Sequence, residues 1–157
     1  MLRFLMLCVV LGSDGDKVPV KGITTTANDY CGGALPPAAE MAKATATRAD
    51  PGAHLRLYRG KVAQGEALEV KSDEKARFTL VLPPGEWCVV DGRRRILPGT
   101  KPAPGADPKC WAAAAVGCDL IWTIDRKDGK APPDAVVHFQ QACDWSPPCG
   151  PNIAGPP

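Results

Sequence analysis

The stretch RFTLVLPPGEWCVV, Arg77 to Val90, decides the fold. In its first half every second residue is apolar (Phe78, Leu80 and Leu82), which is the pattern of a strand with one buried face. The tripeptide PPG that follows predicts a tight turn, because proline fixes φ and glycine accepts a positive φ. The rest, EWCVV, is rich in β-forming residues and predicts the next strand in a run of antiparallel strands.

The same alternation continues on both sides of this stretch. AHLRLYRG, residues 53–60, sets Leu55 and Leu57 on one face against Arg56 and Tyr58 on the other. Further strand candidates lie at residues 16–29, 66–72, 120–124 and 135–140. Several short strands separated by turn residues predict a β-sandwich or a barrel.

Proline and glycine set the rest of the architecture. The 157 residues include 17 prolines and 16 glycines, too many for long helices. Residues 36–49, PPAAEMAKATATRA, predict a short helix, since proline suits a first helical turn. Residues 97–109, LPGTKPAPGADPK, predict a long surface loop. We therefore expect residues 14–157 to form one mainly β domain, a single antiparallel β-sandwich with a short helical insertion and long Pro/Gly-rich loops.

The N-terminus has the outline of a secretory signal. Arg3 precedes a continuous apolar run at 4–11, and the small residues Gly and Ser follow at 12–13. We expect residues 1–13 to be such a signal. Two alternatives stay open: lipidation of Cys8, which would tie the protein to a membrane, and a buried N-terminal strand.

Six cysteines remain beyond this signal, and an even number in an exported chain predicts up to three disulfides. The disulfide candidates are Cys31, Cys88, Cys110, Cys118, Cys143 and Cys149. Short separations favour Cys110–Cys118 and Cys143–Cys149, which leaves Cys31–Cys88; other pairings stay open. The signal and the cysteines together predict a secreted, periplasmic or cell-envelope protein.

The segments HLRLYRG and EVKSDEKARFTLVLPPGEWCVV resemble transthyretin-like (prealbumin-like) or carboxypeptidase-regulatory-like β-sandwich modules, with a core at residues 53–90. Those modules carry a Thr-Asp turn that contains glycine; here Ser72 stands for the threonine and Ala76 for the glycine. The flanking YCGGALPP and C-x5-C segments resemble a group of bacterial exported proteins. The resemblance implies a fold and carries no activity with it.

The sequence points to no catalytic, metal or cofactor site. Its two histidines, His54 and His138, lie on predicted strands, and the cysteine spacings are longer than those of structural zinc sites. A net charge of +2 is too small for a general nucleic-acid binder. The run DGRRR, residues 91–95, predicts a solvated loop rather than an anion site.

Four tryptophans separate into two pairs. Trp87 and Trp122 lie on predicted strands and are expected in the core, whereas Trp111 and Trp145 neighbour cysteines. We expect the second pair to pack on disulfides, with an exposed surface that binds a glycan or peptide as the alternative.

The main hypothesis is a non-enzymatic exported or surface-associated binding or structural module with an unknown protein or glycan partner. The alternatives are a small hydrolase or metal-dependent enzyme that uses His54 or His138, and a protease inhibitor that acts through the loop at 98–108.

Overall fold

The structure is a computed structural model of the chain, and it describes residues 17–31, 34–125, 134–141 and 149–150. The predicted signal at 1–13, with Cys8, lies outside these residues, as do Cys143 and Trp145. Within the described part, no helix is long and apolar enough to cross a membrane.

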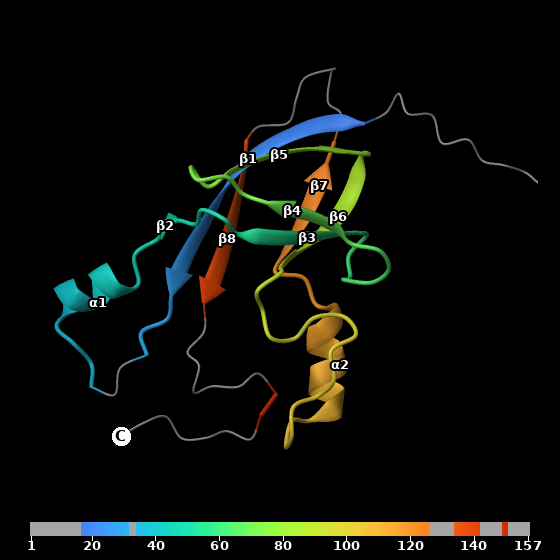
Figure 1. Cartoon of the computed structure of the whole chain (residues 1–157). Helices are drawn as coiled ribbons and strands as arrows, with labels where there is room; N and C mark the ends of the chain where they lie inside the picture. Colours follow the sequence, from blue (N-terminus) through green and yellow to red (C-terminus); the bar gives the residue numbers. More distant parts are fainter. Residues whose placement is uncertain (1–16, 32–33, 126–133, 142–148, 151–157) are drawn as a thin grey trace, which may run out of the picture.

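Eight strands form two four-stranded sheets that pack face to face (Figure 1). Sheet A consists of β1 (Val18–Asn28), β2 (Arg48–Ala49), β5 (Arg77–Leu82) and β8 (Ala135–Gln141). Sheet B has the order β4 (Leu68–Lys71), β3 (His54–Arg59), β6 (Gly85–Asp91) and β7 (Leu120–Ile124). The mainly β sandwich predicted from the sequence is confirmed.

One strand pair departs from the antiparallel prediction. β8 runs parallel to β1, with Ile23 opposite Val136 and Thr25 opposite His138. The strand before β8 in the chain, β7, belongs to the other sheet. No hairpin therefore ties β8 to a neighbour in its own sheet, and its direction is not set by a tight turn.

The alternating residues of both sheets meet in one core. Leu55 and Leu57 of β3 face Phe78, Leu80 and Leu82 of β5 across the sandwich, and all five are buried. This is the burial that the alternation predicted.

Both tryptophans expected in the core lie there. Trp87 is buried, and Trp122 packs against the same cluster with its ring 5.7 Å from that of Phe78.

Gly22 allows β1, β5 and β8 to lie close together in sheet A. A Cβ atom built there would lie 2.5 Å from the carbonyl oxygen of Ala135 and 2.5 Å from the ring of Phe78. Both distances are far below van der Waals contact, so no larger residue fits while the ring and strand keep their places.

Asp73 organises the turn between β4 and β5. Oδ1 of Asp73 accepts the backbone N–H groups of Lys75 and Arg77, each at 2.8 Å. These bonds, that from Arg77 first, lower the pKa of Asp73. Ala76 takes the left-handed conformation, φ 58°, that glycine would adopt more easily.

A group of buried hydrogen bonds links this turn to the rest of the fold. The hydroxyl of Thr24 donates to the carbonyl oxygen of Asp50 at 2.7 Å, and the Ser72 hydroxyl donates to the same oxygen at 3.0 Å. Oγ of Ser72 also accepts the N–H of Ala53 at 2.9 Å. The Ser72 hydroxyl at the end of β4 is thus bonded to the segment between β2 and β3.

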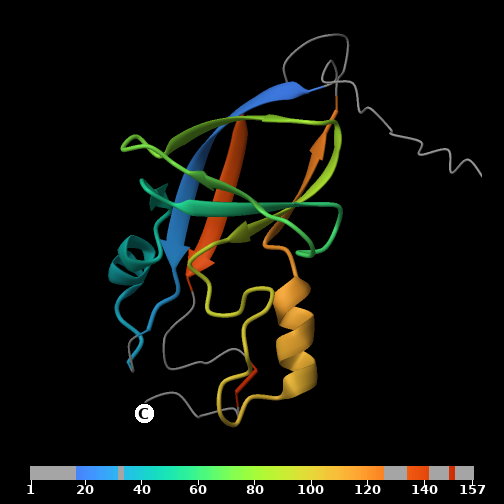
Figure 2. The same cartoon turned by 45° about the vertical axis from the view of Figure 1, so that its right-hand side comes forward.

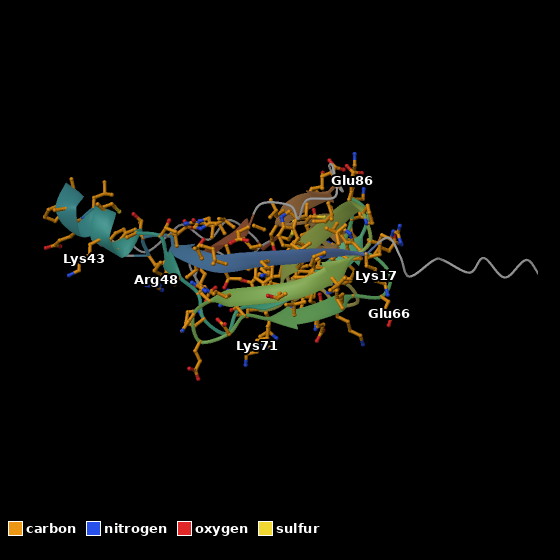
Figure 3. All side chains as sticks on the ribbon, turned by 90° about the horizontal axis from the view of Figure 1, so that it is seen from above. Lys17, Lys43, Arg48, Glu66, Lys71 and Glu86 are labelled. Carbon is orange, nitrogen blue, oxygen red and sulfur yellow. A yellow bond between two sulfur atoms is a disulfide. The ribbon has the colours of Figure 1, made fainter. Side chains whose placement is uncertain are left out.

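Two helices lie outside the sandwich. α1 (Ala38–Ala44) falls within the predicted insertion, has no buried residue, and projects beyond the end of the sheets (Figures 1 and 3). α2 (Pro108–Val116) was not predicted. Its signal was present in the sequence, because Asp107 followed by Pro108 is a typical N-cap and first helical residue.

Candidate functional site: a braced proline loop

Residues 97–107, here called the proline loop, connect β6 to α2 at one end of the sandwich. Figure 2 shows this loop, α2 and residues 149–150 together beyond the sheets. The sequence predicted a long surface loop here. The structure adds that the loop is held at both ends: Trp111 of α2 bonds to Thr100, and Cys149 bonds to Asp107.

The first turn of the loop is LPGT. The Thr100 N–H donates to the carbonyl oxygen of Leu97 at 3.0 Å, with Pro98 and Gly99 between them and φ 81° at the glycine. Proline followed by a positive-φ glycine defines a type II turn. The Thr100 hydroxyl also donates to the Leu97 carbonyl oxygen at 2.7 Å, which closes the turn a second time.

The second turn, APGA, repeats this design. The Ala106 N–H donates to the carbonyl oxygen of Ala103 at 3.0 Å, across Pro104 and Gly105, whose φ is again 81°. Two closed turns therefore bracket a short segment, Lys101–Pro102.

An ion-pair clamp anchors the chain that enters the loop. The Arg93 guanidinium donates Nη1 and Nη2 to the two carboxylate oxygens of Asp50, at 3.0 and 2.6 Å. It donates Nε and Nη2 to Asp91, at 2.9 and 2.8 Å. The Asp50 and Asp91 side chains are only 10% and 13% exposed. Hydrogen bonds to Asp91 and then Asp50 raise the pKa of Arg93, which stays charged.

The next arginine holds the far end of α2. Nη2 of Arg94 donates to the carbonyl oxygens of Ala114 and Ala115 at 3.0 and 3.1 Å, and Nη1 lies 3.4 Å from Oδ1 of Asp119. A cation at a helix C-terminus is favourable because the last carbonyl groups have no partner within the helix. Residues 92–95 form a loop, as predicted, but Arg93 and Arg94 are bonded to protein groups and are not simply solvated.

A small second core lies under the loop. Ile96, Trp111 and Ala115 are buried together, with Ala106 and Cys149 packed against them. The Trp111 indole N–H donates to the carbonyl oxygen of Thr100 at 3.1 Å, which ties α2 to the first turn. At 7% exposure, Trp111 packs beside a disulfide and cannot form an exposed binding surface with Trp145.

A disulfide closes the base of the loop. Cys110 in α2 is bonded to Cys149, and the Asp107 N–H donates to the Cys149 carbonyl oxygen at 2.9 Å. Oδ1 of Asp107 in turn accepts the N–H groups of Lys109 and Cys110, at 2.7 and 3.1 Å, and so caps α2.

The sequence-based pairing of the cysteines is wrong. The second disulfide joins Cys88 to Cys118, so neither Cys31–Cys88 nor Cys110–Cys118 can form. Cys110 lies in the first turn of α2 and Cys118 lies beyond its end, about 9 Å of helical rise away, which is beyond the reach of a disulfide. Cys149 is taken by Cys110, which excludes Cys143–Cys149. Cys31 is also disulfide-bonded.

The outer face of sheet B carries a further apolar cluster that the sequence did not indicate. Tyr58, predicted on the polar face of its strand, is buried with Ala63, Cys88 and Val90. The Cys88–Cys118 disulfide forms part of this cluster, which brings the chain at the end of α2 onto the sheet.

The two histidines lie on opposite sides of the sandwich. His54 is exposed on the outer side of sheet B, next to buried Leu55. His138 is exposed on sheet A between buried Val137 and Phe139, and its Nδ1 lies 3.1 Å from the Thr25 hydroxyl. Both are cross-strand histidines, as predicted, and they cannot act together in one site.

Among the described residues, no three His, Cys, Asp or Glu side chains are arranged to hold a metal ion. The chain matches no protein-family model, no curated protein and no solved structure. Two disulfides within the described residues are typical of proteins that fold in an oxidising compartment. The site is therefore characterised by its geometry alone.

Proposed function

We propose that this protein is an exported binding module that presents the proline loop to a protein partner. The observation behind the proposal is that the ends of the loop are fixed whereas its middle is exposed. Its ends are fixed by two turns, a disulfide, a small core and paired arginines, whereas Lys101, Pro102 and Ala103 are all exposed.

Rigidity of this kind favours binding. A loop that is already ordered loses little conformational entropy when a partner immobilises it. Proline adds to this effect, since its φ is fixed in the free protein as well. The Lys101 ammonium forms no hydrogen bond or ion pair within the described residues, so it is available to a carboxylate of the partner.

A protein fits the loop better than a glycan does. Sugar-binding surfaces use exposed aromatic rings, and Trp111, the aromatic residue that bonds to the loop within the described part of the chain, is buried. Export is supported by the apolar leader and by the disulfides. The resemblance to transthyretin-like and carboxypeptidase-regulatory-like modules implies a fold and names neither an activity nor a ligand.

Inhibition of a protease through the same loop is the second candidate. Lys101 and Ala103 are each followed by a proline, whose nitrogen carries no hydrogen. If the loop bound a protease as a substrate-like strand, Pro102 and Pro104 could donate no backbone hydrogen bond. For this reason we place binding ahead of inhibition. Assays against proteases that cleave after lysine and after alanine separate the two functions.

Photo-crosslinking tests the proposal. p-Benzoylphenylalanine is placed at position 101, or at Lys43 on α1 as a matched exposed control (Figure 3), and the protein is irradiated in the cells that produce it. We expect a discrete protein adduct from position 101 and none of the same mass from position 43. Equal adducts from both positions, or none from either, would contradict the proposal.

A further inference from the structure

The disulfide at the base of the proline loop differs in its surroundings from the disulfide in sheet B. Cys88 is fully buried, and the Sγ atom of its partner Cys118 lies 3.1 Å from the carbonyl oxygen of Lys61. Cys110, by contrast, is exposed in the first turn of α2, and Cys149 is half-buried. Cys118 is half-buried, as Cys149 is, so the two bonds differ at their other sulfur. A thiol in solution can approach Cys110, whereas packed side chains keep it from Cys88.

We propose that Cys110–Cys149 is an exchangeable disulfide and that its reduction releases the proline loop. The inference rests on the proposed function, since it describes how the presentation of that same loop is regulated. The reductant would be a dithiol, such as the active-site pair of a thiol–disulfide exchange protein.

The exchange balances as follows. A thiolate of the dithiol attacks Sγ of Cys110, a mixed disulfide forms, and Cys149 leaves as a thiolate that takes up a proton. The second thiol of the reductant then attacks its own partner sulfur and frees Cys110. The dithiol ends as a disulfide, and two electrons pass to Cys110 and Cys149.

The position of Cys110 favours its release in the second step. A thiolate in the first turn of a helix is stabilised by the unpaired N–H groups at that end, and a stabilised thiolate is a better leaving group. The carboxylate of Asp107 lies in the same turn and accepts two of those N–H groups, so it opposes part of this effect.

Reduction should act on one end of the loop more than on the other. Cys149 accepts the Asp107 N–H and packs on the core that includes Ala106, next to the second turn. The first turn is held separately, by the bond from the Trp111 indole to Thr100. Loss of the disulfide should therefore loosen Ala106 and Asp107 and leave Thr100 protected.

Limited reduction followed by alkylation tests the chemistry. The folded protein is treated with graded dithiothreitol, its free thiols are alkylated, and peptides are identified by mass spectrometry. We expect Cys110 and Cys149 to be alkylated at concentrations at least tenfold lower than Cys88 and Cys118. The Cys31 peptide, read in the same spectra, reports the remaining disulfide. Equal or reversed order between the two pairs would overturn the inference.

Hydrogen exchange on the partly reduced protein tests the consequence. We expect the amides of Ala106 and Asp107 to exchange at least tenfold faster after selective reduction, while Thr100 changes less than twofold. The double variant Cys110→Ser/Cys149→Ser should reproduce the reduced pattern without any reductant. Unchanged exchange in both samples would overturn the release of the loop.

Crosslinking from position 101 separates this inference from the function it rests on. An adduct that forms in oxidised protein and is lost after reduction supports both. An adduct that survives reduction unchanged contradicts only the redox release. If oxidised protein gives no adduct, the proposed function fails first.

Discussion

Replacement of Arg93 by alanine should strongly destabilise the end of the sandwich that carries the loop. Two carboxylates, Asp50 and Asp91, would remain close together with little solvent around them and no cation between them. Removal of one partner from a buried ion pair costs about 3–5 kcal/mol. About a third of the Arg93 side chain is open to solvent, so we expect about 2–4 kcal/mol at pH 7.

The charge balance among Arg93, Asp50 and Asp91 predicts how the variants rank in stability. One guanidinium neutralises two carboxylates, so Asp50→Asn removes a surplus negative charge and should cost less than Arg93→Ala. Arg93→Lys keeps the charge but cannot donate in two pairs at once, and should fall between them.

Urea unfolding followed by tryptophan fluorescence measures these effects, since Trp87 and Trp122 lie in the core. The disulfides stay oxidised throughout. A cost below about 0.5 kcal/mol for Arg93→Ala, which is typical of an exposed pair, would refute the reasoning. So would an Asp50→Asn variant that is less stable than Arg93→Ala.

Three further results are expected. Gly22→Ala should lower the free energy of unfolding by about 3 kcal/mol or more, because its Cβ would lie 2.5 Å from the carbonyl oxygen of Ala135; soluble yield and urea midpoint check this. Asp73 should titrate below 3.8 in an NMR pH series, so the stability that it provides is present above its unfolded pKa and is lost as pH falls through the folded value. Cys110→Ser/Cys149→Ser should cost about 4 kcal/mol by the chain-entropy relation for a separation of 39 residues, measured by thermal unfolding against the oxidised native protein.

Periodicity made the sandwich predictable. Alternation at Leu55 and Leu57 and at Phe78, Leu80 and Leu82 placed those side chains on the buried face. The PPG turn does connect β5 to β6, but these strands lie in different sheets and do not pair with each other. Alternation and turn residues are local features, and each strand carries its own signal. The direction of β8 and the burial of Tyr58 depend on contacts between distant segments, which a single sequence does not display.

The site was harder to predict for the same reason. The sequence showed a proline-rich loop and cysteines, but the pairing depends on α2, which places Cys110 beside Cys149 and away from Cys118. The alanines of α2 lack the apolar periodicity that marks an amphipathic helix, so only Asp107 and its proline neighbour indicated it. Likewise, nothing local distinguishes an arginine bound by Asp50 from one in solvent.

The central claim is that the exposed part of the proline loop is presented by the fold and is not needed by it. Replacement of Lys101, Pro102 and Ala103 by Ser-Gly-Ser tests this directly, since their side chains form no hydrogen bond or ion pair within the described residues. We predict that the free energy of unfolding in urea changes by less than about 1 kcal/mol, as for most surface substitutions. A loss of about 3 kcal/mol or more, comparable to a core substitution, would show that the segment is structural and would contradict the account.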